Sequence, residues 1–196
     1  MSQEYTHEEK KELLNLARTT IEKYLKNQTP DYPNTDNPKF MEKRGVFVTL
    51  HKEGDLRGCI GYPLPEKPLI EAIVDNAISA ATEDYRFNPV EPGELKDIDI
   101  EISVLTVPEP VVNYKDVVLG RDGIIISKGF NKGLLLPQVP VEQGWNLEEY
   151  ISYGCMKAGL SSDEWKRHGR GIVNIETFQA IIFGEKERVN MDRDIC

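Results

Sequence analysis

The sequence predicts an α+β (mixed α/β) fold in which flanking helices cover a mainly antiparallel or mixed sheet. Stretches with apolar residues at helical spacing alternate with short stretches rich in β-branched and aromatic residues. Most of these short stretches are joined in pairs by turns, which favours hairpins over parallel crossovers. At 196 residues the chain is long enough for one well-packed domain, and we expect a single domain over residues 5–190 and a short tail over residues 191–196.

Three helices are predicted. The first begins at a T-x-x-E capping box, in which Thr6 and Glu9 satisfy each other's exposed backbone N–H groups. The second covers residues 70–81, where the apolar residues form one stripe. The third begins at Asn146, whose cap is completed by Glu149.

Six strands are predicted. Residues 45–50 and 56–62 form a hairpin around a Lys-Glu-Gly-Asp turn. Residues 97–104 alternate between acidic or hydroxyl side chains and Ile or Val, so we expect the apolar half to face the core and the polar half to face solvent. The remaining predicted strands are a hairpin of residues 123–126 and 133–136 and a last strand over residues 175–183.

Composition narrows the class of protein. The 196 residues include 24 basic and 33 acidic side chains, which gives a formal net charge of -9. Nucleic-acid binding needs a positive surface, so we expect no nucleic-acid partner. The polar start of the chain lacks the apolar core of a signal peptide, and no apolar run reaches the 18 or so residues of a membrane span. We therefore expect a soluble cytoplasmic protein.

The sequence predicts neither a metal nor a cofactor, as the cysteines and the absence of nucleotide-binding motifs show. Cys59, Cys155 and Cys196 are odd in number and far apart, so we interpret them as reduced thiols. No C-x-x-C pair with zinc-ligand spacing is present. Nor does the chain contain a G-x-G-x-x-G or Walker sequence.

The stretch LRGCIG, residues 56–61, is the strongest functional clue. If the strand is regular, Arg57 and Cys59 project from one face, and the positive charge favours the thiolate of a catalytic Cys59. The alternative is a small buried hydrophobe, which is how most free cysteines behave. A third interpretation, which we prefer, is an anion cradle in which Arg57 and the backbone N–H groups near Gly58 and Gly61 bind a carboxylate or phosphate.

A nucleophilic Cys59 needs a base, and the sequence ties none to it. His51 ends the strand that pairs with LRGCIG and is either a neighbour or an exposed turn residue. His7 lies in the first helical cap, and His168 lies in a basic loop. The case for a cysteine–histidine pair is weak from the sequence alone.

Several motifs together resemble the AMMECR domain family. They lie in the family's order over roughly residues 8–185. The resemblance implies one unit folded as two unequal lobes with a cleft between them. In many microbial genomes the family's members travel with a Memo-type protein and a radical-SAM protein, which implies these as possible partners. The motifs are LRGCIG at 56–61, YRFNPV at 85–90, EISVLT at 101–106, GLLLPQV at 133–139, EQGW at 142–145 and CMKAGL at 155–160.

The same motifs supply the other candidate ligand-binding residues. Arg86 follows a helix end and either faces a ligand or forms a structural ion pair with Asp84 or Glu83. Gln138 and Glu142 lie on a predicted loop after a strand, where binding residues concentrate. We expect residues 57, 86 and 138 to line one concavity.

These observations leave two hypotheses for function. The first is an enzyme or enzyme component whose cleft around LRGCIG binds a small anionic or peptide-like ligand. The second is a non-catalytic interaction module that docks a Memo-type or radical-SAM partner. No complete catalytic constellation is readable, so the sequence leaves open whether a reaction is catalysed.

Overall fold

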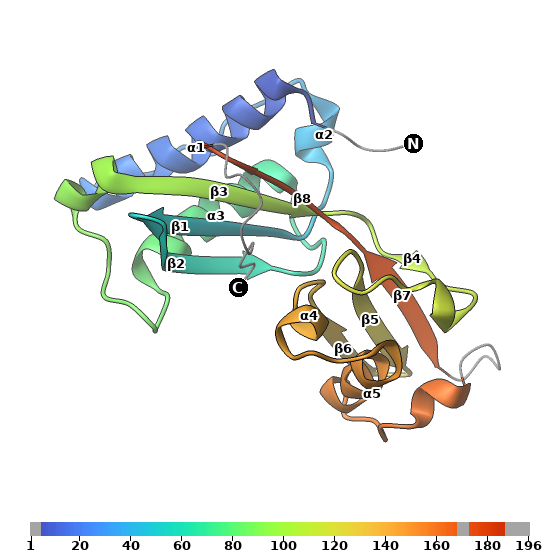
Figure 1. Cartoon of the computed structure of the whole chain (residues 1–196). Coiled ribbons are helices and arrows are strands. Elements are labelled where there is room, and N and C mark those ends of the chain that lie inside the picture. Colours follow the sequence, from blue (N-terminus) through green and yellow to red (C-terminus); the bar gives the residue numbers. More distant parts are fainter. Residues whose placement is uncertain (1–4, 168–172, 187–196) are drawn as a thin grey trace. The chain divides into compact units, whose positions relative to one another are not determined.

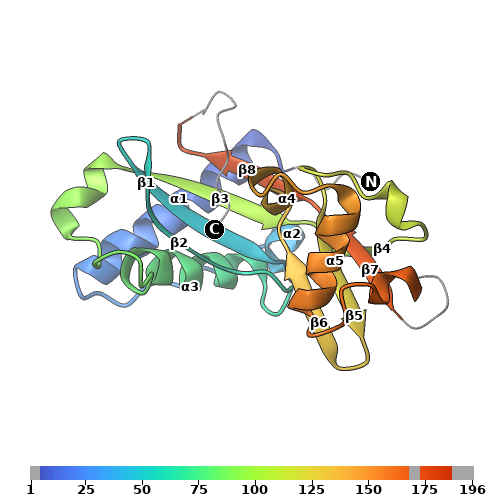
Figure 2. The ribbon, with the colours of Figure 1, turned by 60° about the horizontal axis from the view of Figure 1, so that its bottom comes forward.

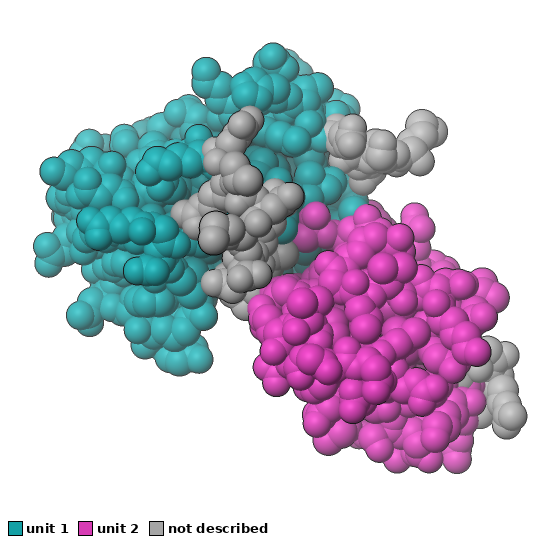
Figure 3. All heavy atoms as spheres, viewed as in Figure 1, with its two compact units in different colours: residues 1–106, 181–196 teal, residues 107–180 magenta. Residues whose placement is uncertain are grey.

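The computed structural model describes residues 5–167 and 173–186, and these form two compact units, coloured separately in Figure 3. The first unit comprises Met1–Thr106 and Ile181–Cys196, and the second comprises Val107–Ala180. Each unit contains a four-stranded sheet, with the orders β2-β1-β3-β8 and β4-β7-β5-β6 (Figure 1). The α+β prediction is confirmed, with two sheets where we expected one.

The elements follow the predicted helices and hairpins closely. The first unit contains α1 (His7–Leu25), α2 (Pro38–Met41), β1 (Val46–Lys52), β2 (Asp55–Tyr62), α3 (Leu69–Thr82), η1 (Pro92–Asp97) and β3 (Ile98–Leu105), and β8 (Ala180–Gly184) joins its sheet. The second contains β4 (Glu109–Pro110), η2 (Tyr114–Asp116), β5 (Gly123–Lys128), β6 (Asn131–Leu135), α4 (Val139–Glu142), α5 (Leu147–Lys157), η3 (Glu164–Arg167) and β7 (Asn174–Phe178). None of the helices in the described part of the chain is long and apolar enough to span a bilayer.

Both predicted capping boxes are present. The Thr6 N–H donates to Glu9 at 2.7 Å, and the Glu9 N–H donates to the Thr6 hydroxyl at 3.2 Å. Asn146 and Glu149 make the same pair of bonds at the start of α5. Each box satisfies two N–H groups that have no partner within the helix, which is why these boundaries could be predicted from four residues each.

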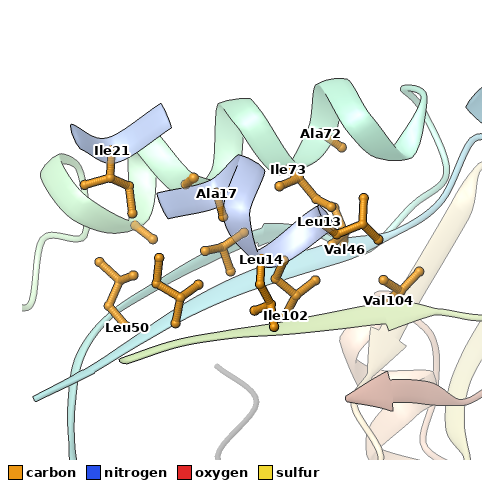
Figure 4. Packing of buried hydrophobic residues seen from close by; sticks show 14 of the residues in the cluster. Leu13, Leu14, Ala17, Ile21, Val46, Leu50, Ala72, Ile73, Ile102 and Val104 are labelled. Carbon is orange, nitrogen blue, oxygen red and sulfur yellow. The ribbon is translucent and has the colours of Figure 1, made fainter. Parts of the chain in front are cut away.

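The core of the first unit lies between its sheet and the two long helices. Helices α1 and α3 lie on the same face of the sheet (Figure 2). Every second side chain of β1 and β3 points toward them, in keeping with the two-residue period of a strand. Figure 4 shows Leu13, Ile73 and Val46 packed together in this layer. Burying each such side chain contributes about 1.5–3 kcal/mol to folding.

A β-bulge interrupts the β1–β2 hairpin at Arg57. Thr49 pairs with Cys59 and Leu50 with Gly58, but the next residue, His51, pairs with Leu56, so Arg57 is the extra residue. The shared face that we expected for Arg57 and Cys59 assumed regular alternation. The bulge breaks that alternation, and the assumption was wrong.

The second unit has its own core between its sheet and α5. The buried residues include Ile124 and Ile126 from β5 and Tyr150 and Ile151 from α5. Trp165 lies in η3 and is buried in this core. The predicted hairpin of residues 123–126 and 133–136 corresponds to β5 and β6, which pair in antiparallel fashion.

The predicted last strand is in fact two strands. Residues 174–178 form β7 in the second sheet, and residues 180–184 form β8 in the first, with Gln179 between them. The sequence around Gln179 contains no glycine or proline that would signal a break. The chain changes sheet at Gln179 because the residues before and after it pair with different strands. Local sequence does not encode such tertiary pairing.

Candidate functional site

The face of the first sheet opposite α1 and α3 carries a group of buried polar side chains. We call this group the polar face. Its register places Cys59, Thr49 and Glu101 side by side across three strands. It consists of Thr49, His51, Cys59, Glu101 and Ser103, all of which are buried.

This burial overturns one expectation about β3. We expected the polar half of residues 97–104 to face solvent, yet Glu101 is only 7% exposed and Ser103 is buried as well. Burying a carboxylate or a hydroxyl costs free energy unless the group is hydrogen-bonded, so such groups are uncommon without a structural or chemical role. The alternating pattern correctly predicted the strand, but the prediction that its polar face is exposed to solvent was wrong.

Cys59 is buried and in contact with Thr49. Its side chain is 2% exposed, and the two atoms Cys59 Sγ and Thr49 Oγ1 lie 3.1 Å apart. Cys59 is disulfide-bonded, so the reduced thiol that we expected there is not what the structure shows. A disulfide sulfur has no proton, and the Thr49 hydroxyl is therefore the donor. Cys155 is free and buried, and burial raises the pKa of its thiol.

His51 and Glu101 are the nearest titratable groups to Cys59 on the polar face by register. Thr49 pairs with Cys59 on one side and with Glu101 on the other, while His51 lies two residues further along β1. Diagonal neighbours on one face of a sheet have Cβ atoms about 7–8 Å apart, within reach of long side chains. The fold therefore brings a cysteine, a histidine and a carboxylate to one sheet surface.

Asp84 and Arg86 cap the outer edge of β2 at Cys59. The Cys59 N–H donates to Asp84 Oδ2 at 2.8 Å, and Arg86 Nη2 donates to the Cys59 carbonyl at 3.3 Å. The two side chains are joined by Arg86 Nε to Asp84 Oδ1 at 2.9 Å and Nη2 to Oδ2 at 2.7 Å. The ion pair that we weighed against a ligand role for Arg86 is thus present.

The electrostatics of this pair fix Asp84 in its charged form. The Arg86 guanidinium, aided by the Cys59 and Arg86 backbone N–H groups, lowers the pKa of Asp84 to about 2. Asp84 is almost fully buried, and its carboxylate connects Arg86 of the YRFNPV motif to Cys59 of LRGCIG. This connecting role was not predicted from the sequence. The only signal for it was its two-residue separation from Arg86.

Arg57 is committed to contacts within the first unit. Its Nε and Nη2 donate to Glu94 Oε2 at 3.2 and 2.9 Å, and its Nη1 donates to the Asn88 carbonyl at 3.0 Å. A weaker bond reaches the Pro89 carbonyl at 3.4 Å. The guanidinium therefore ties β2 to the segment that follows α3.

The two glycines of LRGCIG are explained by close packing. A Cβ at Gly58 would lie 2.2 Å from the Ala80 carbonyl oxygen of α3, and a Cβ at Gly61 would lie 2.4 Å from the Phe47 ring. Only glycine allows these approaches. The Cys59 N–H also donates to Asp84, so this N–H is not open to an anion here. The preferred anion cradle stays a prediction.

The other candidate residues lie elsewhere. Gln138 immediately precedes α4 and Glu142 is its last residue, so both belong to the second unit, and a concavity shared with residues 57 and 86 stays a prediction. His7 is exposed on α1. His168, Cys196 and the tail over residues 191–196 lie outside the described residues. Within the described ranges, no three His, Cys, Asp or Glu side chains are grouped as metal ligands.

Comparisons with known proteins place this fold in a family. The AMMECR1 family model matches residues 14–183. A protein of Methanothermobacter thermautotrophicus is 50% identical over 165 residues, covering 81% of this chain and 86% of the relative. A protein of Methanocaldococcus jannaschii is 50% identical over 182 residues, covering 87% of each chain. The chain belongs to the AMMECR1 family.

A solved structure also resembles most of the chain. The crystal structure of an uncharacterized protein from Pyrococcus horikoshii superimposes with a TM-score of 0.69 at 43% sequence identity. The match covers 89% of this chain and 90% of that one. This agreement supports the α+β architecture across both units.

Proposed function

We propose that the chain is a cytoplasmic enzyme, or a component of one, whose reactive group is the Cys59 thiol on the polar face. The observation that carries the proposal is the register of β1, β2 and β3, which puts Cys59, His51 and Glu101 on one buried sheet surface. A thiol becomes a nucleophile when a neighbouring base removes its proton, and a carboxylate beside the histidine favours the charged imidazolium. In this arrangement His51 takes the proton from Cys59, and Glu101 stabilises the resulting charge.

The ligand that best suits this site is small and peptide-like. A thiolate attacks a polarised carbonyl carbon, as found in an amide, an ester or a thioester. A small anionic ligand was the other expectation, but the donors of Arg57 are engaged by Glu94 and two backbone carbonyls. We therefore favour an acyl or peptide-like ligand over an inorganic anion. The reaction requires a reduced Cys59, so a thiol reductant belongs in every assay.

The thiol can be tested before any substrate is known. After reduction, the protein is alkylated over a range of pH, and mass spectrometry of its peptides gives the rate at Cys59 and Cys155 separately. We expect Cys59 to react faster than the core thiol of Cys155, with a titration below the free-thiol pKa of about 8.5. His51→Ala should move that titration upward, while His7→Ala, at the exposed histidine of α1, should leave it unchanged.

Two results would count against the proposal. Cys59 that reacts only after denaturant is added would be a core residue, and identical titrations in the wild type and His51→Ala would remove histidine from the site. Thermal unfolding of each variant comes first, because a buried substitution can act through stability alone. The anion cradle would be favoured instead if millimolar sulfate, phosphate or small carboxylates shifted the melting curve of the wild type but not that of Arg57→Ala.

A second candidate function is a docking module for a partner such as the Memo-type or radical-SAM protein. One observation favours it: Tyr85, next to the buried Asp84, is 94% exposed. Exposed aromatic side chains are enriched at protein interfaces. Binding of a purified partner that is lost in Tyr85→Ala but kept in Cys59→Ala would support the docking module over the enzyme.

A further inference from the structure

Helix α5 of the second unit presents core-type side chains on its outer side. Its inner side packs in the unit's core through Tyr150, Ile151 and Cys155. On the outer side, Tyr153 is 43% exposed and Met156 is 54% exposed. A surface helix normally carries polar residues there, and neighbouring exposed apolar side chains are typical of interaction surfaces.

These side chains border a groove between α5 and η3, which we call the α5 groove. It has a volume of about 480 Å³. Tyr153, Met156 and Trp165 give it an apolar lining, and Glu148, Glu149 and Asp163 supply carboxylates. All of these residues belong to the second unit, whereas the polar face belongs to the first.

The aromatic lining is held in place by local contacts. The Tyr153 ring stacks on Trp145 with centroids 3.9 Å apart and planes 3° from parallel. Trp165 Nε1 donates to the Ser152 hydroxyl at 2.9 Å. Side chains that are already ordered lose less conformational entropy when a partner binds.

The charges around the α5 groove favour a cationic partner. Glu149 is fixed by its capping bond to the Asn146 N–H at 2.8 Å. Asp163 accepts a bond from the Ser161 hydroxyl at 2.6 Å, and this bond lowers its pKa, so it is ionised at neutral pH. The cation in the lining is Lys166, whose ammonium lies 5.7 Å from the centre of the Trp165 ring. Three carboxylates therefore face one ammonium.

We propose that the α5 groove docks an amphipathic helix of a partner protein that carries lysine or arginine beside leucine-type side chains. The apolar side chains contact Tyr153 and Met156, and the basic ones meet the carboxylates of Glu148 and Asp163. Helix-in-groove recognition uses apolar anchors at helical spacing in this way. Complementary charge sets the orientation and speeds association.

The two tryptophans of the chain make this proposal directly measurable. Trp145 stacks on Tyr153 and Trp165 lines the α5 groove, and the sequence contains no other tryptophan. The probe is a synthetic helical peptide of leucine and lysine that lacks aromatic residues. Titrated into the full chain at physiological salt, it should change the tryptophan emission and give a saturable binding curve. The matched peptide with glutamate in place of lysine should bind at least about tenfold more weakly.

Paired variants separate the α5 groove from the rest of the acidic surface. The double variant Tyr153→Ala, Met156→Ala should weaken binding about tenfold or more, because buried anchors carry most interface energy. Phe130→Ala removes a fully exposed aromatic side chain from the β5–β6 turn of the same unit and should have no effect. Asp163→Lys should weaken binding several-fold, whereas Glu109→Lys, with the same change of charge on exposed β4, should not.

Three results of the peptide titrations would overturn the proposal. They are equal binding of the lysine and glutamate peptides, equal weakening by the variants and their controls, and a saturated titration with unchanged tryptophan emission. Emission that depends on protein concentration without any peptide would mean that a second copy of the chain covers the α5 groove, and this too rejects a heterologous partner. If the double variant fails to fold, the comparison of Asp163→Lys with Glu109→Lys still tests the proposal.

Discussion

At the scale of single residues, Asp84 and Arg86 hydrogen-bond to the backbone at the outer edge of β2, as a neighbouring strand does elsewhere in a sheet. The carboxylate accepts the Cys59 N–H at 2.8 Å, and the guanidinium donates to the Cys59 carbonyl at 3.3 Å. An edge strand with unpaired N–H and C=O groups is open to pairing with another chain. The side-chain pair satisfies both groups at the residue that we propose to be reactive.

The first prediction concerns the stability contributed by this pair. Asp84→Ala leaves the Cys59 N–H and the Arg86 guanidinium without their acceptor, so we expect it to lower the free energy of unfolding by about 1–3 kcal/mol. Asp31→Ala, in the exposed pair with Lys23, is the matched control and should cost less than about 0.5 kcal/mol. Urea denaturation measures both. Equal costs for the two variants would mean that the Asp84 contacts contribute nothing to folding.

A second prediction separates packing from ligand binding at Gly58. A Cβ there would lie 2.2 Å from the Ala80 carbonyl oxygen, which belongs to the backbone of α3 and cannot move without shifting the helix. We expect Gly58→Ala to cost about 1–3 kcal/mol of unfolding free energy. Gly93→Ala, where nothing lies within 4 Å, should stay within about 0.5 kcal/mol. A fully stable Gly58→Ala would show that the glycine is not there for packing.

At the scale of elements, local signals were predictable and contacts between strands were not. The capping boxes of α1 and α5 each depend on side chains three residues apart, so their sequences alone located both helices. The division of the last predicted strand at Gln179 and the bulge at Arg57 depend on pairing with distant strands. For the same reason, the sequence could not place His51 and Glu101 on the same sheet face as Cys59, because that arrangement exists only in the register of β1 with β2 and β3.

Glu9 connects two elements through one carboxylate. It completes the capping box of α1, and it also accepts bonds from Asn37 Nδ2 at 3.0 Å and Lys39 Nζ at 2.9 Å. Asn37 is the N-cap of α2, so Glu9 joins the starts of α1 and α2. The hydrogen bonds from Lys39 and Asn37 lower the pKa of Glu9 to about 2.

The third prediction is the pH dependence that follows from this lowered pKa. A carboxyl whose pKa falls from 4.5 in the unfolded chain to about 2 in the folded one stabilises the fold above about pH 4.5. That contribution is lost as pH falls toward 2, because the folded protein then also binds the proton. The unfolding free energies of wild type and Glu9→Gln should differ by a constant amount above pH 5 and converge between pH 4.5 and 2. Glu8→Gln, at the exposed neighbour, is the control, and a gap that stays constant down to pH 2 would contradict the assignment.

At the scale of the whole molecule, the two units differ in how the chain builds them. The sheet of the second unit uses only strands from residues 107–180, and its core is separate from that of the first. The first unit needs two separate stretches of chain, because its sheet is completed by β8. Beyond β8, Glu185 accepts a bond from the Ile100 N–H at 2.9 Å and pairs with Arg18 of α1.

The last prediction follows from this difference in connectivity. A fragment of residues 107–180 keeps all four strands of its sheet together with α5 and their shared core, so we expect it to fold alone with a cooperative thermal transition. Its stability should be modest, a few kcal/mol, because a domain of this size buries a small core. A fragment of residues 1–106 lacks β8 and Glu185, which exposes the edge of β3 and leaves Arg18 without its carboxylate. That fragment should unfold at lower temperature than the same unit in the full chain, or aggregate through its open edge. Circular dichroism and calorimetry of both fragments decide the matter. If residues 107–180 stay unfolded while residues 1–106 fold, the first unit is the independent one and the second depends on it.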